Sequence, residues 1–325
     1  MGKEFENLGH DRMFKNLLHL FLEEYLQCFY PDFNFKIDWS RHVRLLSEGT
    51  DIPKLNIKEN EPRFVDVLFE VYLKDEEKKT LLHFENQSYS QKKFQRRVYE
   101  YNCLIRSNHP DCSVYSFAIC FNSYPRTGVR NRYEYNSVDG LEKNVFTFNE
   151  VHLKNFYWRD SSINHHPIIW ALAPLMYRDN SEDDYEILVS CLQKVIESYG
   201  FLGTDKANMI TLFLDYYFQP DDKILEKIIN ELNEYILEGD EEIMTSIATN
   251  IQQISQVRAK STMLKNAIQF RFFDGKAIPQ YTLNLIESIE DGKKQERVIG
   301  EIMSIKDNDP EIISKLNTYL QRGTL

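Results

Sequence analysis

The sequence contains few of the features that mark a secreted or membrane-spanning protein. Its five cysteines are scattered and none forms a CxxC pair, so they predict neither a disulfide framework nor a zinc site. No stretch approaches the roughly 18–20 uncharged apolar residues that cross a bilayer. Charged residues also occupy the start of the chain, where a signal peptide needs an apolar run. We therefore expect reduced thiols, a cytoplasmic location and no membrane contact.

Internal repeats and low-complexity tracts are also lacking, and the composition favours a folded chain. Hydrophobic residues make up 42% of the 325 positions and aromatic residues 13%, which is ample for a packed core. At about 100–200 residues per domain, this length predicts two domains, or one domain with a large extension. We place their boundary near residues 179–183, where the polar stretch RDNSEDD precedes a segment with helical periodicity only. The expected domains are residues 10–178 and a helical region of residues 182–325.

Charge is unevenly distributed along the chain. The net charge of −11 argues mildly against nucleic acid as a partner, because phosphate repels an acidic surface. Residues 86–132, however, carry eight basic and two acidic side chains, a local charge of +6, which leaves −17 for the rest. Local charge decides binding more than the total does, so this segment remains a candidate for phosphate contact.

Hydrophobic periodicity predicts an α/β arrangement in the first domain and helices in the second. The expected strands are residues 64–73, 80–88, 113–122 and 144–153, with a short strand near Val43–Leu46. The expected helices of the first domain are residues 11–29, 90–107 and 166–178. Those of the second are residues 182–199, 204–218, 221–237, 240–258, 281–290 and 293–320.

Two neighbouring strand-like runs, residues 64–73 and 80–88, predict a β-hairpin, because only a short polar segment separates them. A turn centred between Asp75 and Glu76 pairs residues whose numbers add to 151. Side chains of a strand alternate between the two faces of a sheet. One face of the hairpin is therefore expected to join a hydrophobic core, and the opposite face collects polar side chains.

The polar face of this hairpin carries a candidate metal site. Asp66 lies opposite Glu85 in the expected register, and Gln87 follows on the same face. Facing carboxylates repel each other, and Mg²⁺ removes that repulsion while keeping positions for water and substrate phosphate. We predict Asp66 and Glu85 as ligands of Mg²⁺, with Mn²⁺ as a substitute, and Gln87 as a residue that orients water. The alternative is an ordinary hairpin with one solvated face.

The hairpin and its surroundings resemble a known family. The stretches that carry the resemblance are HDRMFKNLLHLFLEEYL at 10–26, RFVDVLFEVYL at 63–73, HFENQSYSQKKFQRRVYEYNCLI at 83–105 and NFYWRD at 155–160. They are similar to the Rpn/YhgA-like recombination-promoting nucleases, often labelled putative transposases, of the PD-(D/E)XK nuclease superfamily. The resemblance covers about residues 10–178.

This resemblance implies a restriction-endonuclease-like core, a mixed sheet flanked by helices, followed by an all-α C-terminal region. It also implies a Mg²⁺-dependent endonuclease that hydrolyses DNA phosphodiester bonds and promotes recombination or transposition. Asp66 is then the first metal-binding acid and Glu85 the second, and Gln87 fills the position of the consensus lysine. Val65 stands where the motif name has proline.

The predicted helix at residues 90–107 is basic and should lie beside the site. Its Lys92, Lys93, Arg96 and Arg97 can neutralise DNA phosphates, although a solvated helix face explains many charge runs. Arg97 lies next to the apolar stripe of the helix, so we expect it to point toward the sheet.

An acid from the first helix sometimes completes the metal site in such folds. Glu23, Glu24 and Asp11 are candidates, although a surface role is favoured for each of them.

Two other functions remain open. The chain could be a catalytically silent DNA- or protein-binding member of the same fold, although the presence of all three site residues argues against it. It could also be a helical interaction protein with an N-terminal scaffold. The acidic helical region lacks a catalytic motif, and self-association is one role for it.

Overall fold

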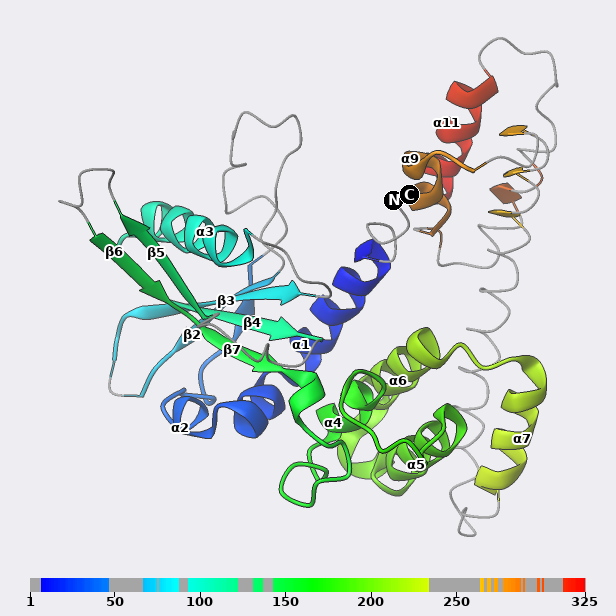
Figure 1. Ribbon diagram of the computed structural model, residues 1–325, viewed down its shortest axis with the longest axis horizontal. Coiled ribbons are helices and arrows are strands. Elements are labelled where there is room, and N and C mark those ends of the chain that lie inside the picture. Colours follow the sequence, from blue (N-terminus) through cyan, green and yellow to red (C-terminus); the bar gives the residue numbers. More distant parts are fainter. Residues whose placement is uncertain are drawn as a thin grey trace.

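A mixed sheet flanked by helices forms the N-terminal part of this computed structural model (Figure 1). The structure describes residues 7–46, 67–74, 76–87, 93–121, 131–136 and 143–233, and parts of 264–324. Within these residues the α/β class, the mixed sheet and the helical region that follows are as expected.

The main sheet has five strands in the order β1-β2-β3-β4-β7. Their bounds are Arg44–Leu45, Val67–Tyr72, Lys79–Gln87, Ser113–Cys120 and Asn149–His152. Strands β1, β2 and β3 are antiparallel neighbours, whereas β3, β4 and β7 run parallel to one another. Helix α3, Phe94–Asn108, makes the crossover from β3 to β4 that a parallel pair requires.

The predicted register of the hairpin is confirmed over its described part. Val67 pairs with Phe84, Leu68 with His83, and each pair of numbers adds to 151. Asp66 lies outside the described residues.

One face of the sheet packs on α1, Asn7–Phe29, and is apolar. Phe84 and Phe117 stack at 4.9 Å between ring centroids, and the Tyr25 ring of α1 meets Phe84 edge-on at 5.7 Å. Val67 and Phe69 are buried in the same cluster. This is the core face that the alternation of the hairpin predicts.

The opposite face, covered by α3 and called the α3 face below, differs from the expectation of a polar surface. Leu68 and Leu81 are buried there against Ile105 of α3, and Val98 packs on Ala118 of β4. Helix α3 has its own apolar stripe, so it closes over the sheet and buries this face too. The alternative of an ordinary hairpin with one solvated face is therefore wrong for the described residues, and Glu85 and Gln87 lie inside the protein.

The region from residue 131 to 175 contains breaks that periodicity does not show. The run expected as one strand at 144–153 is divided at Phe148 into β6, Lys143–Thr147, and β7. Strand β5, Arg132–Asn136, pairs with β6 in a separate two-stranded sheet. Shorter elements are α2 at Pro31–Asn34, η1 at Leu153–Asn155, α4 at Pro167–Leu172 and η2 at Ala173–Leu175.

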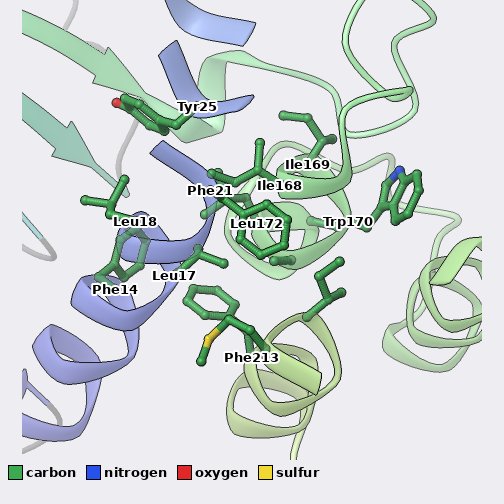
Figure 2. Close-up of a cluster of buried hydrophobic side chains, with 14 of the residues drawn as sticks. Phe14, Leu17, Leu18, Phe21, Tyr25, Ile168, Ile169, Trp170, Leu172 and Phe213 are labelled. Carbon is green, nitrogen blue, oxygen red and sulfur yellow. The ribbon is translucent and has the colours of Figure 1, made fainter. Parts of the chain in front are cut away.

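Helices that follow β7 share the core of the α1 side. They are α5, Asp184–Glu197; α6, Tyr199–Phe218; and α7, Asp222–Asn233. Figure 2 shows Phe14, Leu17 and Phe21 of α1 beside Ile168 of α4 and Phe213 of α6. The boundary predicted near residues 179–183 falls within this packing, since one hydrophobic cluster has members on both sides of it.

A second hydrophobic cluster lies farther along the chain. Helices α9, Gln280–Glu287, and α11, Ile312–Thr324, contribute Ile286, Leu316 and Leu320 to it. The helix expected at residues 240–258 lies outside the described residues. Among the described helices, none has the length and apolar character needed to span a bilayer.

Candidate active site

Three parallel strands place polar side chains in rows on the α3 face. Cross-strand partners on neighbouring strands share a face of the sheet, so the register defines these rows directly. The rows are His83 and Ser116; Glu85, Ala118 and Glu150; and Gln87, Cys120 and His152. The strands supply seven chemically active side chains to one buried surface near their carboxyl ends, the place where parallel sheets commonly bind ligands.

Glu85 is the centre of this arrangement. Its side chain is only 1% exposed, and each carboxylate oxygen has a basic neighbour. The Oε1 atom lies 3.0 Å from Nε2 of His83, and Oε2 lies 3.2 Å from Nε of Arg97. A buried carboxylate is tolerated when it is paired in this way.

His83 connects Glu85 to the next strand. Its ring is fully buried, and its Nδ1 atom lies 3.0 Å from Oγ of Ser116. Asn102 of α3 donates its side-chain amide to the same hydroxyl oxygen at 3.0 Å. One proton assignment satisfies all of these atoms: the Ser116 hydroxyl donates to Nδ1, and Nε2–H donates to Glu85. His83 is thus a positioning residue that orients the carboxylate.

Gln87 ends the polar run of β3. It is 5% exposed, and its Oε1 atom has no hydrogen-bond partner among the described residues. The backbone around it is fixed, because the N–H of Phe121 donates to the Gln87 carbonyl at 3.1 Å. A buried amide oxygen without a partner costs free energy, so this position carries an acceptor that no described residue uses.

The basic residues of α3 divide into two groups. Arg97 points toward the sheet and reaches Glu85, as its place beside the apolar stripe predicts. Arg96 is 59% exposed and bonds Glu100 at 2.6 Å, and Lys93 is exposed just before the helix. Lys92 lies outside the described residues. Arg96 and Lys93 are placed for contact with an external anion, whereas Arg97 belongs to the buried site.

Acids of α1 lie on the other side of the sheet. Glu24 forms an ion pair with Lys206 of α6, and Glu23 is exposed. The neighbouring Tyr25 packs on Phe84, which belongs to the apolar face. This geometry does not bring either glutamate to Glu85. The side chain of Asp11 lies outside the described residues.

A group of three side chains on β4 and β7 was not predicted from the sequence. Cys120, Glu150 and His152 place one ligand atom each within 4.8 Å of one another. The Cys120 thiol lies 3.7 Å from Oε1 of Glu150, and Nε2 of His152 hydrogen-bonds that same oxygen. A thiol, a carboxylate and an imidazole in this arrangement could hold a metal ion. The 28 residues between the two strands hide this group from any spacing rule.

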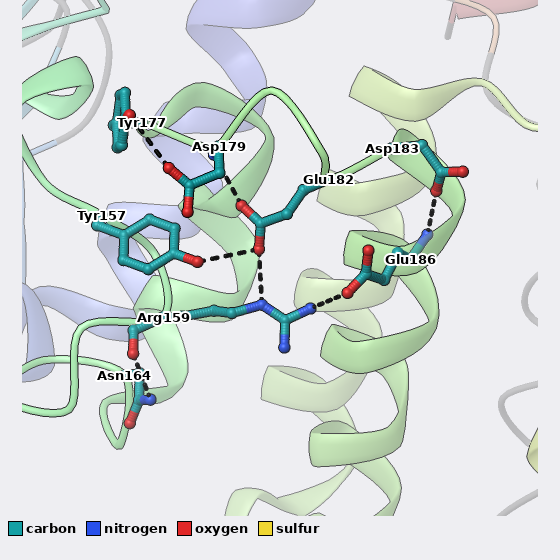
Figure 3. Close-up of polar contacts among 8 residues, drawn as sticks. All are labelled: Tyr157, Arg159, Asn164, Tyr177, Asp179, Glu182, Asp183 and Glu186. Atoms are coloured by element: carbon teal, nitrogen blue, oxygen red, sulfur yellow. Dashed lines mark hydrogen bonds and ion pairs between the residues drawn. The ribbon is translucent and has the colours of Figure 1, made fainter.

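The NFYWRD stretch has a structural role (Figure 3). Arg159 donates from Nε to Glu182 and from Nη2 to Glu186, each at 2.7 Å. The Tyr157 hydroxyl also donates to Glu182, at 3.2 Å. Burial opposes the charge of Glu182, but hydrogen bonds from the Asp179 backbone, Arg159 and Tyr157 outweigh it and lower the pKa of that carboxyl. These contacts fasten the loop after η1 to the start of α5.

Comparison with known proteins does not identify a family for this chain. No family model matches it, and no curated protein or solved structure shows significant similarity to it.

Proposed function

We propose that the protein is a metal-dependent DNA endonuclease, with Glu85 as a metal-binding and catalytic residue. The observation that carries this proposal is the placement of Glu85: a buried carboxylate near the end of β3, oriented by His83 and facing Arg97 of α3. Gln87, on the same face, adds a buried amide oxygen that has no partner in the described part of the chain. A role in recombination or transposition follows from the resemblance alone.

The order of elements supports a restriction-endonuclease-like core as part of this proposal. Helix α1 precedes the antiparallel strands β1 to β3, and α3 then leads to the parallel strand β4. The resemblance implies a mixed sheet flanked by helices, with Asp66 as its first metal-binding acid and Glu85 as its second. Glu85 lies on β3, and Asp66 of the family pattern comes just before β2 in the sequence.

The residues fit a hard divalent cation. Mg²⁺ prefers oxygen ligands and takes one or two carboxylates, and Glu85 with Asp66 would supply them. When bound, the metal would polarise the scissile phosphate and activate a water. His83 holds the carboxylate of Glu85 in place. The amide oxygen of Gln87 accepts a hydrogen bond from a water. Arg97, beside Glu85, offers a positive charge to a phosphate.

The experiment is nicking of supercoiled plasmid by the purified full-length chain, with Mg²⁺, with Mn²⁺ and with EDTA. Glu85→Gln keeps the size of the side chain but removes its charge, so cleavage should fall at least about 100-fold, as for loss of a main electrostatic contributor. Asp66→Ala should lower cleavage to a similar extent. Glu77→Gln, an exposed residue of the hairpin turn, is the matched control.

Cleavage that survives both site substitutions would assign the nuclease to a contaminant or to another site. A folded wild-type protein that cuts nothing with either metal would overturn the catalytic proposal.

One observation favours a second candidate, a catalytically silent DNA- or protein-binding member of the same fold. Both oxygens of Glu85 already have partners in the protein, and the charge of Arg97 compensates the carboxylate without a metal. This candidate predicts DNA retention by the wild-type chain that does not depend on Mg²⁺ and is unchanged in Glu85→Gln.

A further inference from the structure

We propose that Cys120, Glu150 and His152 form a second metal site, specific for a soft divalent ion and best suited to Zn²⁺. The three ligand atoms lie within 4.8 Å of one another, on adjacent parallel strands. This inference does not depend on the nuclease proposal, because its three metal ligands are not among the residues proposed to bind Mg²⁺.

The chemistry of the donors selects the metal. A thiolate and an imidazole are poor ligands for Mg²⁺ but bind Zn²⁺ well, and a carboxylate oxygen is also a Zn²⁺ ligand. Three protein ligands leave a fourth tetrahedral position for water or substrate, which is the pattern of open zinc sites. The site therefore differs in kind from the oxygen site proposed at Glu85.

The spacing of the donors fits a bound ion. Tetrahedral bonds of about 2.3 Å to sulfur and about 2.0 Å to oxygen separate those two atoms by about 3.5 Å. The sulfur of Cys120 lies 3.7 Å from Oε1 of Glu150. His152 reaches the same oxygen from its Nε2 atom. Small side-chain movements would thus allow all three donors to meet one ion.

The backbone holds the donors in place. Cys120 and His152 are direct partners in the parallel ladder, and Glu150 precedes His152 by two residues on the same face. All three lie on regular strands, so no loop has to close around the ion. Sites built on strands are more accurately positioned than sites on loops.

Burial gives an independent reason to expect a ligand. His152 is fully buried, Glu150 is 4% exposed in its side chain, and Cys120 is 2% exposed. In the same row, Oε1 of Gln87 is buried without a partner among the described residues. A buried amide oxygen without a partner costs stability, and a water bound to the metal would offer Gln87 a hydrogen bond.

The test uses the full-length chain, purified under reducing conditions, freed of metal with a chelator and titrated with Co²⁺ as the spectroscopic probe. We expect one equivalent to bind with a sulfur-to-cobalt charge-transfer absorption, and Zn²⁺ to displace it. Zn²⁺ should also raise the thermal unfolding midpoint of the wild-type chain, because a ligand that binds only the folded state stabilises it.

Variants separate this site from other thiols. Substitution of residues that only support the ligands of a metal commonly lowers the metal affinity about 10–100-fold. Loss of a ligand itself should cost more, so Cys120→Ser or His152→Gln should weaken Co²⁺ binding at least about 100-fold. Cys103→Ser changes an exposed thiol of α3 and should bind as the wild type does. Circular dichroism shows which variants are folded. If Cys120→Ser or His152→Gln does not fold, Glu150→Gln is used in its place.

Two results would overturn the proposal. The first is a wild-type chain that binds no Co²⁺ or Zn²⁺ with a thiolate signature, which would leave the three residues as a hydrogen-bond network. The second is a charge-transfer absorption that survives unchanged in folded Cys120→Ser. Since neither readout uses DNA cleavage, a failed nuclease assay would not count against this site.

Discussion

The two faces of the main sheet are both buried, yet they are built from different chemistry. The α1 side stacks Phe84 on Phe117 and closes them with Tyr25, a packing that hydrophobic burial alone explains. The α3 side buries Glu85 and His83 on the strand that carries Phe84. Adjacent residues of one strand thus serve two different purposes.

The difference teaches where function is to be sought. Buried polar and charged groups cost free energy unless each is paired, and apolar side chains of equal size usually stabilise a core as well or better. A fold alone would not need Glu85, Gln87, Glu150 and His152 inside the protein. We therefore interpret the α1 face as the source of stability and the α3 face as the source of function.

The largest expected effect comes from the apolar face. Phe84→Ala removes a fully buried ring from the centre of the core and should lower the free energy of unfolding by about 3–5 kcal/mol. Urea denaturation measures this change. Phe35→Ala, at a ring that is 75% exposed, should cost no more than about 0.5 kcal/mol. Equal losses in the two variants would break the comparison.

The polar network of Arg159 and Glu182 provides a second test, because it contains none of the candidate site residues. Glu182→Gln keeps the shape but removes the negative charge, and its NH2 group cannot accept the hydrogen bonds that both carboxylate oxygens accept, so we expect a loss of about 1 kcal/mol at neutral pH. DNA cleavage should be unchanged. Glu226→Gln, an exposed residue of α7, is the control for stability.

The pH dependence of that network has a definite sign. The pKa of Glu182 in the folded chain is lower than its ordinary value of 4.5, so the stabilisation is complete above 4.5. It is lost as the pH falls below 4.5 through the folded pKa. Urea denaturation at a series of acidic pH values should show a steeper loss for the wild type than for Glu182→Gln. Parallel curves would contradict the assignment.

The smallest effect is expected at the exposed bases beside the site. Replacing Lys93 and Arg96 together with alanine should weaken DNA binding several-fold at low salt and reduce the salt slope by about 2, one for each lost phosphate contact. Fluorescence anisotropy across a salt series measures both quantities. A matched double variant at the exposed Lys78 and Lys223 should leave the slope unchanged. An equal salt slope in both double variants would show that DNA does not contact Lys93 and Arg96.

Local patterns predicted the local parts of this fold. The hairpin register followed from alternation and the position of the turn, and the helical stripe around Arg97 predicted its direction. The break at Phe148 and the pairing of β5 with β6 were not predicted, because a divided strand has the same alternation as a continuous one. Helix α3 buries the α3 face by packing its apolar stripe on the sheet. Sequence spacing does not specify this tertiary contact.

The same limit applies to the site. Glu85 and Gln87 lie two residues apart on one strand, so alternation alone placed them on one face. Cys120 and His152 meet only because β4 and β7 are parallel neighbours in a particular register. A register between strands so distant along the chain is not encoded in any short spacing, and the group was missed for that reason.

Metal-dependent nicking by Glu85→Gln tests the central claim most directly, with stability measured on the same samples. The account predicts that the variant remains folded at the assay temperature while its Mg²⁺-dependent cleavage falls at least about 100-fold below that of the wild type. Wild-type cleavage rates in a folded Glu85→Gln protein would show that the α3 face is not the catalytic face, and would contradict the account.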